Sequence, residues 1–389
     1  TTGAEDGRLS APFVATPGSA GCDDQKIANG DASTDGTKFE VELEQFLEVS
    51  GGPLRIWSSD KLGRFYVAAR DVSPGERLLV SAPEAIAAHE NLVNNVCARC
   101  FAASSSRLNL KCERCGYAAW CSKACQVAAA DGPMSHAQEC GALERLQAGK
   151  AGTLPRAGRT YLRLVLQTMY RRHYLRSGQG QSPQLDTSRR HATEVLCSGL
   201  EVYEAQGGLS WRDRRDRYAA IVTAFGAAVG DDFEWHQDEV MSLLGAIDCN
   251  SFIVWNKQRR RKLGIGLYVA ASIFNHSCAP NVARVQRDGC VEFYSLSAVP
   301  AGQQLCIAYE DPRKETTARR AELLSTYGFE CACVVCEGRE TLDEKMFCPR
   351  HLGYLIPGKG KDHVWCSVCS PPPTSDMLAA EDPAWDVFG

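Results

Sequence analysis

Apolar residues recur at helical spacing in three stretches of the chain between residues 146 and 246. A repeat of about 3.6 residues places such side chains on one face of a helix, where they can pack against a core. The three stripes are Leu162, Val165, Leu166, Met169 and His173, then Tyr218, Ile221, Val222 and Phe225, then Val240, Leu243, Leu244 and Ile247. We therefore expect a helical region over residues 146–246, interrupted by a polar loop at residues 177–190.

Short runs of β-forming residues flank this helical region on both sides. Turn residues such as Ser73, Pro74 and Gly75 separate the first of them. The runs are Pro53–Trp57, Arg64–Ala69, Arg77–Ser81, Val291–Leu296 and Gln304–Ala308. The pattern predicts an α+β fold, preceded by a disordered leader at residues 1–38, which lack apolar periodicity.

One apolar stretch ends in a compact polar group. Residues 264–281 read Gly-Ile-Gly-Leu-Tyr-Val-Ala-Ala-Ser-Ile-Phe-Asn-His-Ser-Cys-Ala-Pro-Asn, and the polar group is Asn275–Cys278. This length suits a buried strand or a short helix whose polar end lies at a site. Taken alone, Asn-His-Ser could simply be a capped turn.

The composition limits the classes of function. With 389 residues, 44% of them hydrophobic, the chain can bury a sizeable core split between two or more lobes. A formal net charge of −4 gives no general electrostatic reason to bind nucleic acid or an anionic membrane. No apolar run approaches the ~20 residues that cross a bilayer, and we expect neither a membrane span nor a secretory signal.

The chain contains 19 cysteines, an odd number, and many stand in CxxC, CxxxC or CxC pairs with a histidine nearby. In a chain without a secretory signal, this spacing favours zinc thiolates over disulfides. We therefore expect a protein of the cytosol or the nucleus.

The densest group of candidate zinc ligands lies between residues 97 and 140. Eight soft ligands make two closed tetrahedral sites. Residues 122–130 are compatible with a helix, so the two cysteines at its start can lie one turn apart and face one metal. A disulfide nest conflicts with the expected compartment, and a RING-type finger conflicts with the ligand order. The eight residues are Cys97, Cys100, Cys112, Cys115, Cys121, Cys125, His136 and Cys140.

Two smaller cysteine groups follow. The first offers three ligands where zinc needs four, and consists of Cys331, Cys333 and Cys336. The second has two ligand pairs across a loop of about 20 residues, a spacing that suits a zinc ribbon. It consists of Cys348, His351, Cys366 and Cys369.

The sequence resembles the SET-domain protein-lysine methyltransferases, most closely the SET-and-MYND (SMYD-like) family, in four motifs that occur in the family's order. They are residues 249–253 (Cys-Asn-Ser-Phe-Ile), 264–281, 307–309 (Ile-Ala-Tyr) and 327–331 (Tyr-Gly-Phe-Glu-Cys). Residues 63–76 also resemble the opening strands of a SET domain, where the family usually shows Gly-x-Gly. The sequence keeps Gly63 but has Phe65 at the second glycine position.

The resemblance implies a β-rich SET domain with a helical insertion, interrupted by a MYND zinc finger and followed by a post-SET zinc site and a zinc knuckle. The expected boundaries are residues 39–92 for the amino-terminal part of the SET domain, 93–145 for the MYND finger, 146–246 for the helical insertion, 247–312 for the SET core, 313–340 for the post-SET segment, 341–371 for the knuckle and 372–389 for a tail.

The zinc ligands of a MYND finger interleave in the family. The resemblance therefore implies one zinc held by Cys97, Cys100, Cys121 and Cys125, and another held by Cys112, Cys115, His136 and Cys140. It also implies that Cys278 completes the post-SET site beside Cys331, Cys333 and Cys336. Three zinc ions are thus expected, and the carboxyl-terminal group offers a fourth.

The resemblance further implies S-adenosyl-L-methionine as methyl donor and Tyr309 as the catalytic residue, whose hydroxyl orients the methyl group and the amine. The expected channel for the substrate lysine is lined by Phe252, Tyr268 and Tyr327. The residues expected to contact the cofactor are Gly63, Arg64, Phe65, Asn250, Asn275, His276, Tyr309 and Phe329.

Two functions are consistent with these motifs. The first is an S-adenosylmethionine-dependent protein-lysine N-methyltransferase that acts by in-line transfer on a histone or non-histone lysine. The second is a catalytically weak SET-MYND scaffold that recruits proline-rich protein partners through its MYND finger. Asn275, His276 and Tyr309 favour the enzyme, whereas Phe65 favours the scaffold.

Overall fold

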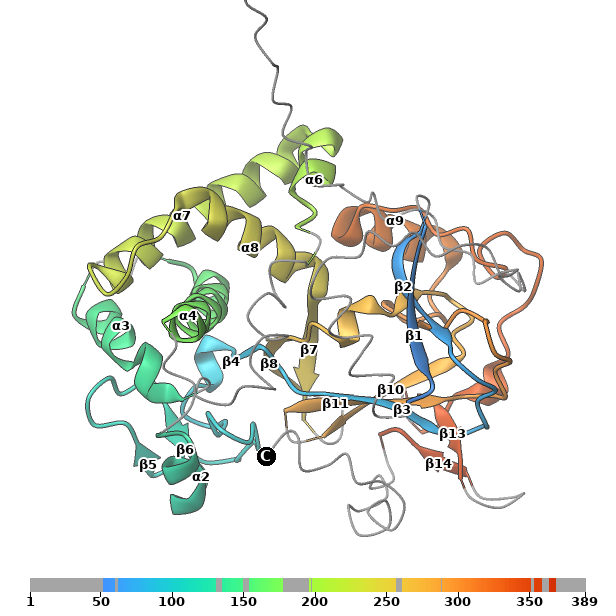
Figure 1. Cartoon of the computed structure of the whole chain (residues 1–389), viewed down its shortest axis with the longest axis horizontal. Coiled ribbons are helices and arrows are strands. Elements are labelled where there is room, and N and C mark those ends of the chain that lie inside the picture. The colour runs from blue at the N-terminus through green and yellow to red at the C-terminus, as the bar shows by residue number, and fades with distance from the viewer. Residues whose placement is uncertain are drawn as a thin grey trace, which may run out of the picture.

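The computed structural model describes residues 52–59, 62–130, 135–149, 154–177, 196, 198–256, 261–287, 289–350, 353–358 and 364–368. The leader expected at residues 1–38 and the tail expected at residues 372–389 lie outside the described residues. Long helices occupy one side of the molecule and most of the strands the other, with a small finger-like module beside the helices (Figure 1).

Among the described residues, the strands form several small sheets instead of one large sheet. The antiparallel pairs are β1 (Leu54–Ser59) with β2 (Gly63–Ala68), β5 (Leu110–Lys111) with β6 (Ala119–Trp120), and β13 (Leu355–Pro357) with β14 (Val364–Cys366). The three-stranded sheets are β10 (Val282–Arg287), β11 (Cys290–Ser295) and β3 (Arg77–Ser81), and β4 (Ala85–Ala88), β8 (Lys262–Leu267) and β7 (Ser251–Trp255). A parallel pair joins β9 (Asn275–His276) to β12 (Cys306–Ile307). Each of the five predicted β runs overlaps a strand, so this part of the α+β prediction is confirmed.

The helices carry the three predicted apolar stripes. The α-helices are α2 (Lys123–Ala128), α3 (His136–Ala148), α4 (Arg156–Arg176), α6 (Leu200–Gln206), α7 (Gly208–Val229), α8 (Gln237–Asn250) and α9 (Thr316–Tyr327), and the 3-10 turns are η1 (Glu90–Leu92), η3 (Ala271–Ile273) and η4 (Glu344–Met346). The stripes lie on α4, α7 and α8, as predicted, with one correction. His173 is exposed and stacks on Phe233 at 4.9 Å between ring centres, so it belongs to the edge of the helical core and not to its interior.

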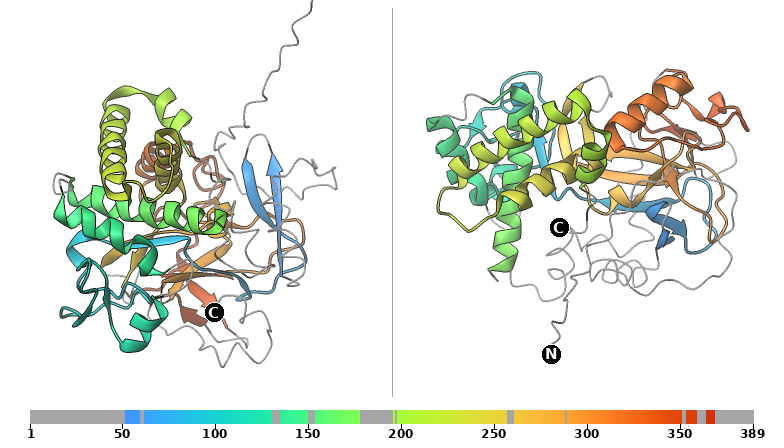
Figure 2. Two further views of the ribbon diagram at one scale, coloured as in Figure 1. Left: turned by 60° about the vertical axis from the view of Figure 1, so that its left-hand side comes forward. Right: turned by 90° about the horizontal axis from the view of Figure 1, so that it is seen from above.

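The core is divided into two large clusters. One lies among α4, α7 and α8 and includes Leu166, Phe225 and Leu244, all of which are fully buried. The other lies among the strands and includes Tyr66 and Phe293. In the further views the green helices and the blue β1–β2 pair stay on separate sides of the molecule (Figure 2). The expected division into lobes is therefore present.

Candidate site residues lie on two connections between elements of the fold. α8 ends at Asn250 and β7 begins at Ser251, so a helix of the expected insertion passes directly into a strand of the expected SET core. Residues 264–281 form the end of β8, the 3-10 turn η3 and the short strand β9, which carries the polar group. The stretch thus combines the two expected alternatives, a buried strand and a short helical turn, and ends in the polar group. Within the described part of the chain, no helix is long and apolar enough to cross a membrane.

The helical core provides the first prediction. Leu166→Ala should lower the free energy of unfolding by about 2–5 kcal/mol, because it opens a cavity in a fully buried cluster. Val127→Ala is the control, since the Val127 side chain is 63% exposed and its loss should cost within about 0.5 kcal/mol. Urea unfolding followed by circular dichroism measures both. Equal costs for the two variants would contradict the assignment of this core.

Candidate active site and metal centres

Two segments that are distant in sequence run side by side at the candidate site. β9 pairs in parallel with β12, with Asn275 opposite Cys306 and His276 opposite Ile307. The backbone N–H of Ser277 donates to the carbonyl of Ile307 at 2.9 Å, which extends the pairing beyond the strands. Tyr309 therefore emerges next to the polar group Asn275–Cys278.

His276 connects Tyr309 to Cys278. Its Nδ1 accepts a hydrogen bond from the backbone N–H of Tyr309 at 3.0 Å, and its Nε2 lies 3.3 Å from the Cys278 Sγ. Burial lowers the pKa of His276 to about 4, so the ring is neutral at pH 7. With Nδ1 acting as an acceptor, the single proton is on Nε2 and points at the sulfur.

Tyr309, Tyr327 and Phe329 form a group that we call the aromatic triangle. Their ring centres lie 4.8 Å apart for Tyr309 and Tyr327, 6.3 Å for Tyr309 and Phe329, and 6.4 Å for Tyr327 and Phe329. The His276 ring lies 5.3 Å from that of Tyr309 and 6.0 Å from that of Phe329. The structure thus brings together aromatic residues from two of the sequence motifs and places them beside a third motif.

The two phenols of the triangle stay protonated at neutral pH. Burial raises the pKa of Tyr327 to about 12 and raises the pKa of Tyr309 well above its usual value. The Tyr309 hydroxyl donates to the carbonyl oxygen of Phe274 at 2.7 Å. Because that bond uses its only proton, the hydroxyl oxygen offers lone pairs to any further partner.

The other two aromatic residues expected at the channel lie in different layers. Phe252 is half-buried, and the guanidinium carbon of Arg284 lies 5.1 Å from its ring centre. Tyr268 packs edge-on behind Phe252 at 5.7 Å and is fully buried, and its hydroxyl donates to the carbonyl of Gly289. Tyr268 therefore supports Phe252 from the core side.

The first two strands reach the polar group from the opposite direction. The side-chain amide of Asn275 donates to the carbonyl of Leu62 at 3.2 Å, directly before Gly63, which has a φ of 62°. A positive φ is readily adopted only by glycine, so this residue type is required at the turn into β2. Phe65 is buried within β2, and the half-buried Arg64 precedes it. The Gly63 backbone and Asn275 are thus neighbours.

Asn250 lies at the end of α8 and is buried. Its side-chain amide donates to the carbonyl of Ala246 at 2.8 Å, one helical turn earlier. This bond holds the side chain against its own helix, at the junction with β7.

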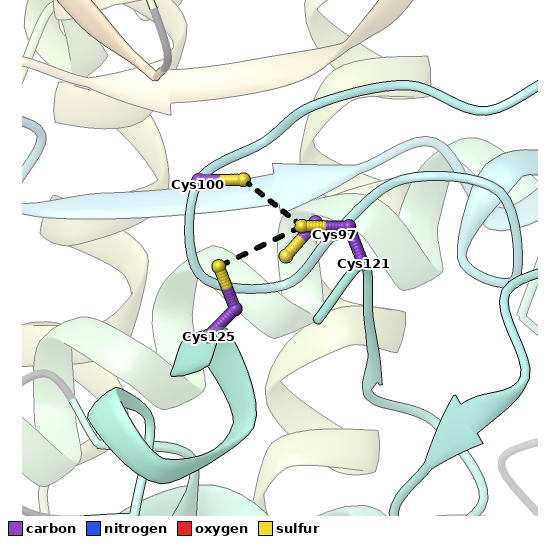
Figure 3. A group of neighbouring side chains, drawn as sticks. All are labelled: Cys97, Cys100, Cys121 and Cys125. Carbon is purple, nitrogen blue, oxygen red and sulfur yellow. Dashed lines mark hydrogen bonds between the residues drawn. The ribbon is translucent and has the colours of Figure 1, made fainter. Parts of the chain in front are cut away.

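The first candidate metal site lies at the start of α2. Its four members are Cys97, Cys100, Cys121 and Cys125, whose sulfurs lie within 4.8 Å of one another (Figure 3). Ser122 caps α2 by accepting from the backbone N–H of Cys125 at 3.2 Å, which fixes two of the ligands one turn apart. With Zn–S bonds of about 2.3 Å, tetrahedral geometry separates sulfurs by about 3.8 Å. The sulfurs of Cys100 and Cys121 are 3.6 Å apart, which fits zinc.

The second candidate metal site lies at the start of α3. It consists of Cys112, Cys115, His136 and Cys140, again within 4.8 Å. The His136 Nε2 is 3.3 Å from the Cys115 sulfur, and the sulfurs of Cys112 and Cys140 are 3.6 Å apart. The structure thus groups these eight ligands in the interleaved pairing expected of a MYND finger.

The third candidate metal site joins the polar group to the post-SET segment. Its members are Cys278, Cys331, Cys333 and Cys336, all buried, with ligand atoms within 4.8 Å. The sulfurs of Cys278 and Cys336 are 3.6 Å apart. A set of four soft, converging donors fits zinc, and its fourth member is the cysteine two residues after His276.

Comparison with known proteins agrees with this arrangement. The SET domain profile matches residues 63–310 of the chain. The chain belongs to the SET-domain family. It is 25% identical over 280 residues to mouse histone-lysine N-methyltransferase SMYD3, and 24% identical over 298 residues to histone-lysine N-methyltransferase ASHR1 of Arabidopsis thaliana. The SMYD-like resemblance and the α+β fold class are confirmed.

The two relatives are longer than the part of them that is matched. The alignments cover 70% and 76% of the chain, but 59% of SMYD3 and 57% of ASHR1. A solved structure of Rubisco LSMT bound to AdoMet is also similar, with a TM-score of 0.42 and 14% identity over 76% of this chain and 57% of that chain.

The carboxyl-terminal ligand group of this SET-domain chain is only partly described. The backbone N–H of Cys348 donates to the carbonyl of Gly353 at 2.8 Å, and a Cβ added to Gly353 would lie 2.9 Å from the Cys366 sulfur. Cys348 and Cys366 therefore lie near the same glycine. His351 and Cys369 lie outside the described residues.

A joint between the helical insertion and the post-SET helix was missed by the sequence analysis. The Tyr203 hydroxyl donates to the carbonyl of Thr326 at 2.6 Å, and the Arg214 guanidinium lies 3.8 Å from the Tyr203 ring centre. Arg214 also pairs with Asp248 at 2.5 Å. These contacts hold the end of α9 directly before Tyr327. A lone tyrosine on α6 carries no signal in the sequence that could have revealed this contact.

The shared cysteine provides the second prediction. The parent protein should contain at least three zinc ions per chain by atomic absorption, and Cys278→Ser should contain one fewer. Because Cys278 also contacts His276, the variant should bind S-adenosylmethionine more weakly in a calorimetric titration. Cys290→Ser is the control, since Cys290 lies in β11 outside the three clusters. A Cys278→Ser protein that loses a zinc but binds the cofactor normally would show that the two sites are independent.

Proposed function

We propose that the chain is an S-adenosylmethionine-dependent protein-lysine N-methyltransferase. The observation that carries the proposal is the aromatic triangle beside β9, in a chain whose SET-domain match spans residues 63–310. When bound, S-adenosylmethionine supplies a methyl group on a sulfonium, and its transfer breaks a C–S bond and forms an N–C bond to a neutral amine. The substrate is a lysine of a histone or another protein.

Several groups of this chain fit the proposed cofactor. Among the described strands, β12 is the one partner of β9, and we propose that the backbone on the other edge of β9 contacts the cofactor. Asn275 adds a half-buried amide oxygen, and Gly63 allows a close backbone approach from β2. Phe329, at the edge of the aromatic triangle, is proposed to stack on the adenine, and Asn250 to contact the amino-acid end.

The substrate amine must lose its proton before transfer. A free lysine has a pKa of about 10.4, so a neutral amine at pH 7 costs about 4–5 kcal/mol. A channel walled by Phe252 and Tyr327 would exclude water, which lowers the pKa of the bound amine. We propose these two residues as the walls, with Tyr268 holding Phe252 from behind.

Tyr309 is the proposed catalytic residue. Its proton is committed to the carbonyl of Phe274, so its oxygen can accept a hydrogen bond from the incoming amine. The ring is held by its own backbone bond to His276 and by packing against Tyr327. Such fixed positioning can supply much of the rate of an in-line transfer.

A second function is favoured by the surface of the MYND module. Val127 on α2 is 63% exposed, beside the first metal site. We propose that this surface recruits proline-rich protein segments, with Val127 as one of its apolar contacts. A titration with S-adenosylmethionine distinguishes an enzyme from a catalytically inactive scaffold, since the scaffold need not bind the cofactor.

The third prediction concerns the Tyr309 hydroxyl. Tyr309→Phe keeps the ring and its packing, so binding of cofactor and peptide should change little. Loss of one positioned hydrogen bond should lower the single-turnover rate by about 10²–10³-fold at saturating cofactor. Tyr294→Phe is the control. It also removes a buried hydroxyl, which donates to Glu292, but Tyr294 belongs to a hydrophobic cluster away from Tyr309. A folded Tyr309→Phe protein with the parent rate would refute the assignment of the catalytic residue.

The fourth prediction is the pH profile. Because the pKa of Tyr327 is about 12 and that of Tyr309 is also strongly raised, neither phenol titrates between pH 7 and 9. The free substrate lysine then limits kcat/KM, which should rise about tenfold per pH unit as the neutral amine becomes more abundant. Initial rates at subsaturating peptide measure this slope. A decrease of kcat/KM over this interval would mean that a group of the protein loses a required proton.

A further inference from the structure

Arg319 is a buried cation beside the third metal site. It lies on α9, and only 3% of its surface is exposed. Each of the five N–H groups of its guanidinium has an acceptor. Nε donates to the Cys278 Sγ at 3.2 Å and Nη2 to the Cys336 Sγ at 3.6 Å. The remaining acceptors are the carbonyls of Pro312 and Lys314 for Nη1 and the Thr316 hydroxyl for Nη2.

The cysteine sulfurs are the groups beside Arg319 that can carry the negative charge to balance its guanidinium. A buried guanidinium is costly unless an anion is paired with it. Within the described part of the chain, no carboxylate forms an ion pair with Arg319, whereas two of its N–H groups face cysteine sulfurs. Protonated thiols would leave the cation without an anionic partner. The guanidinium therefore fits a cluster in which the cysteines are thiolates.

We infer that Arg319 is a positioning residue of the post-SET metal centre, where it balances the charge of the thiolates that hold a divalent, thiophilic cation such as zinc. Four thiolates and one dication carry a net charge of −2 in a buried site. The guanidinium offsets one unit of this charge and hydrogen-bonds two of the sulfurs. This inference goes beyond the proposed methyl transfer and does not depend on it.

Two measurable properties follow from this role. First, Arg319 hydrogen-bonds two of the ligand sulfurs and holds them in place, so its removal should weaken metal binding. Second, a thiolate that accepts hydrogen bonds and lies near a positive charge is a weaker nucleophile, so removal of Arg319 should make Cys278 and Cys336 react faster with an alkylating reagent. A side chain that only supported the backbone would change neither property.

Arg319 also ties the segment after Tyr309 to the cluster. The carbonyls of Pro312 and Lys314 and the hydroxyl of Thr316 all belong to the stretch that leads into α9. One side chain thus links this stretch to Cys278, the residue that contacts His276. Metal binding and the path of the chain behind Tyr309 are coupled through it.

Arg320 offers a matched comparison in the next position of α9. Its Nε donates to the carbonyl of Cys331 at 3.0 Å and its Nη2 to the carbonyl of Cys336 at 3.1 Å. It therefore bonds the same loop through backbone oxygens and contacts no sulfur among the described atoms. Removal of either arginine takes one guanidinium from this loop, but only Arg319 touches the thiolates.

The fifth prediction tests this difference on the zinc-loaded full chain. Competition with a chromogenic chelator should show that Arg319→Met weakens one of the zinc sites about 10–100-fold, as is usual for residues that hydrogen-bond metal ligands. Mass-spectrometric mapping of alkylated cysteines should assign the weakened site to Cys278, Cys331, Cys333 and Cys336. The zinc affinity of Arg319→Lys should lie between those of the wild-type protein and Arg319→Met, because lysine keeps the positive charge but lacks the planar, forked guanidinium. The zinc affinity of Arg320→Met should stay close to that of the wild-type protein.

A spectroscopic measurement covers the case in which Arg319→Met folds poorly. In cobalt-substituted Arg319→Lys protein, the sulfur-to-cobalt charge-transfer bands should shift relative to the parent, because the hydrogen bonds to the sulfurs have changed. They should not shift in Arg320→Met. Zinc affinity, alkylation rates and cobalt spectra that are the same for the Arg319 and Arg320 variants would overturn the inference. None of these measurements involves methyl transfer, so failure of the proposed activity is a separate outcome.

Discussion

Convergence of four cysteines from two distant segments is the constraint on which the site depends. Cys278 follows the polar end of β9, whereas Cys331, Cys333 and Cys336 belong to the post-SET segment. The four sulfurs lie within 4.8 Å of one another, and as thiolates they would repel one another without a cation among them, so a bound metal would couple to closure of the segment. His276 donates to the same sulfur and accepts from the backbone of Tyr309. The position of the proposed catalytic residue is thereby set by the metal centre.

The helical insertion holds the same region from the other side. Tyr203 and Arg214 contact the carbonyls of Thr326 and Ser325 at the end of α9, and Tyr327 is the next residue. The aromatic triangle is thus fixed by a metal cluster at one end and by a helix-to-helix joint at the other. A rigid support of this kind is what in-line transfer needs, because a small misplacement of the reacting groups is costly in rate. The insertion therefore contributes to the site without supplying a reacting group.

The parts that the sequence predicted are those governed by local periodicity or by ligand spacing. The stripes on α4, α7 and α8 follow the helical repeat, and the cysteine pairs follow the reach of a tetrahedral metal. The remainder depends on tertiary packing. His173 lies in phase with its stripe yet is exposed and stacks on Phe233 at the edge of the helical core. Tyr268 lies within a site motif yet packs behind Phe252. Arg319 looks like one more charge on a polar helix, and only its neighbours in space reveal a buried partner of two cysteines.

The division of charge between the two halves of the site has a physical logic. A cluster of four thiolates around a dication is strongly negative, and beside the proposed lysine channel it would draw in water and stabilise an ammonium ion. The Arg319 guanidinium and the Nε2 proton of His276 both point at its sulfurs and partly offset their negative charge. The phenols in front of it stay neutral because burial raises the pKa of each. An anionic centre can therefore lie directly behind the aromatic triangle, whose proposed role is to disfavour a charged lysine.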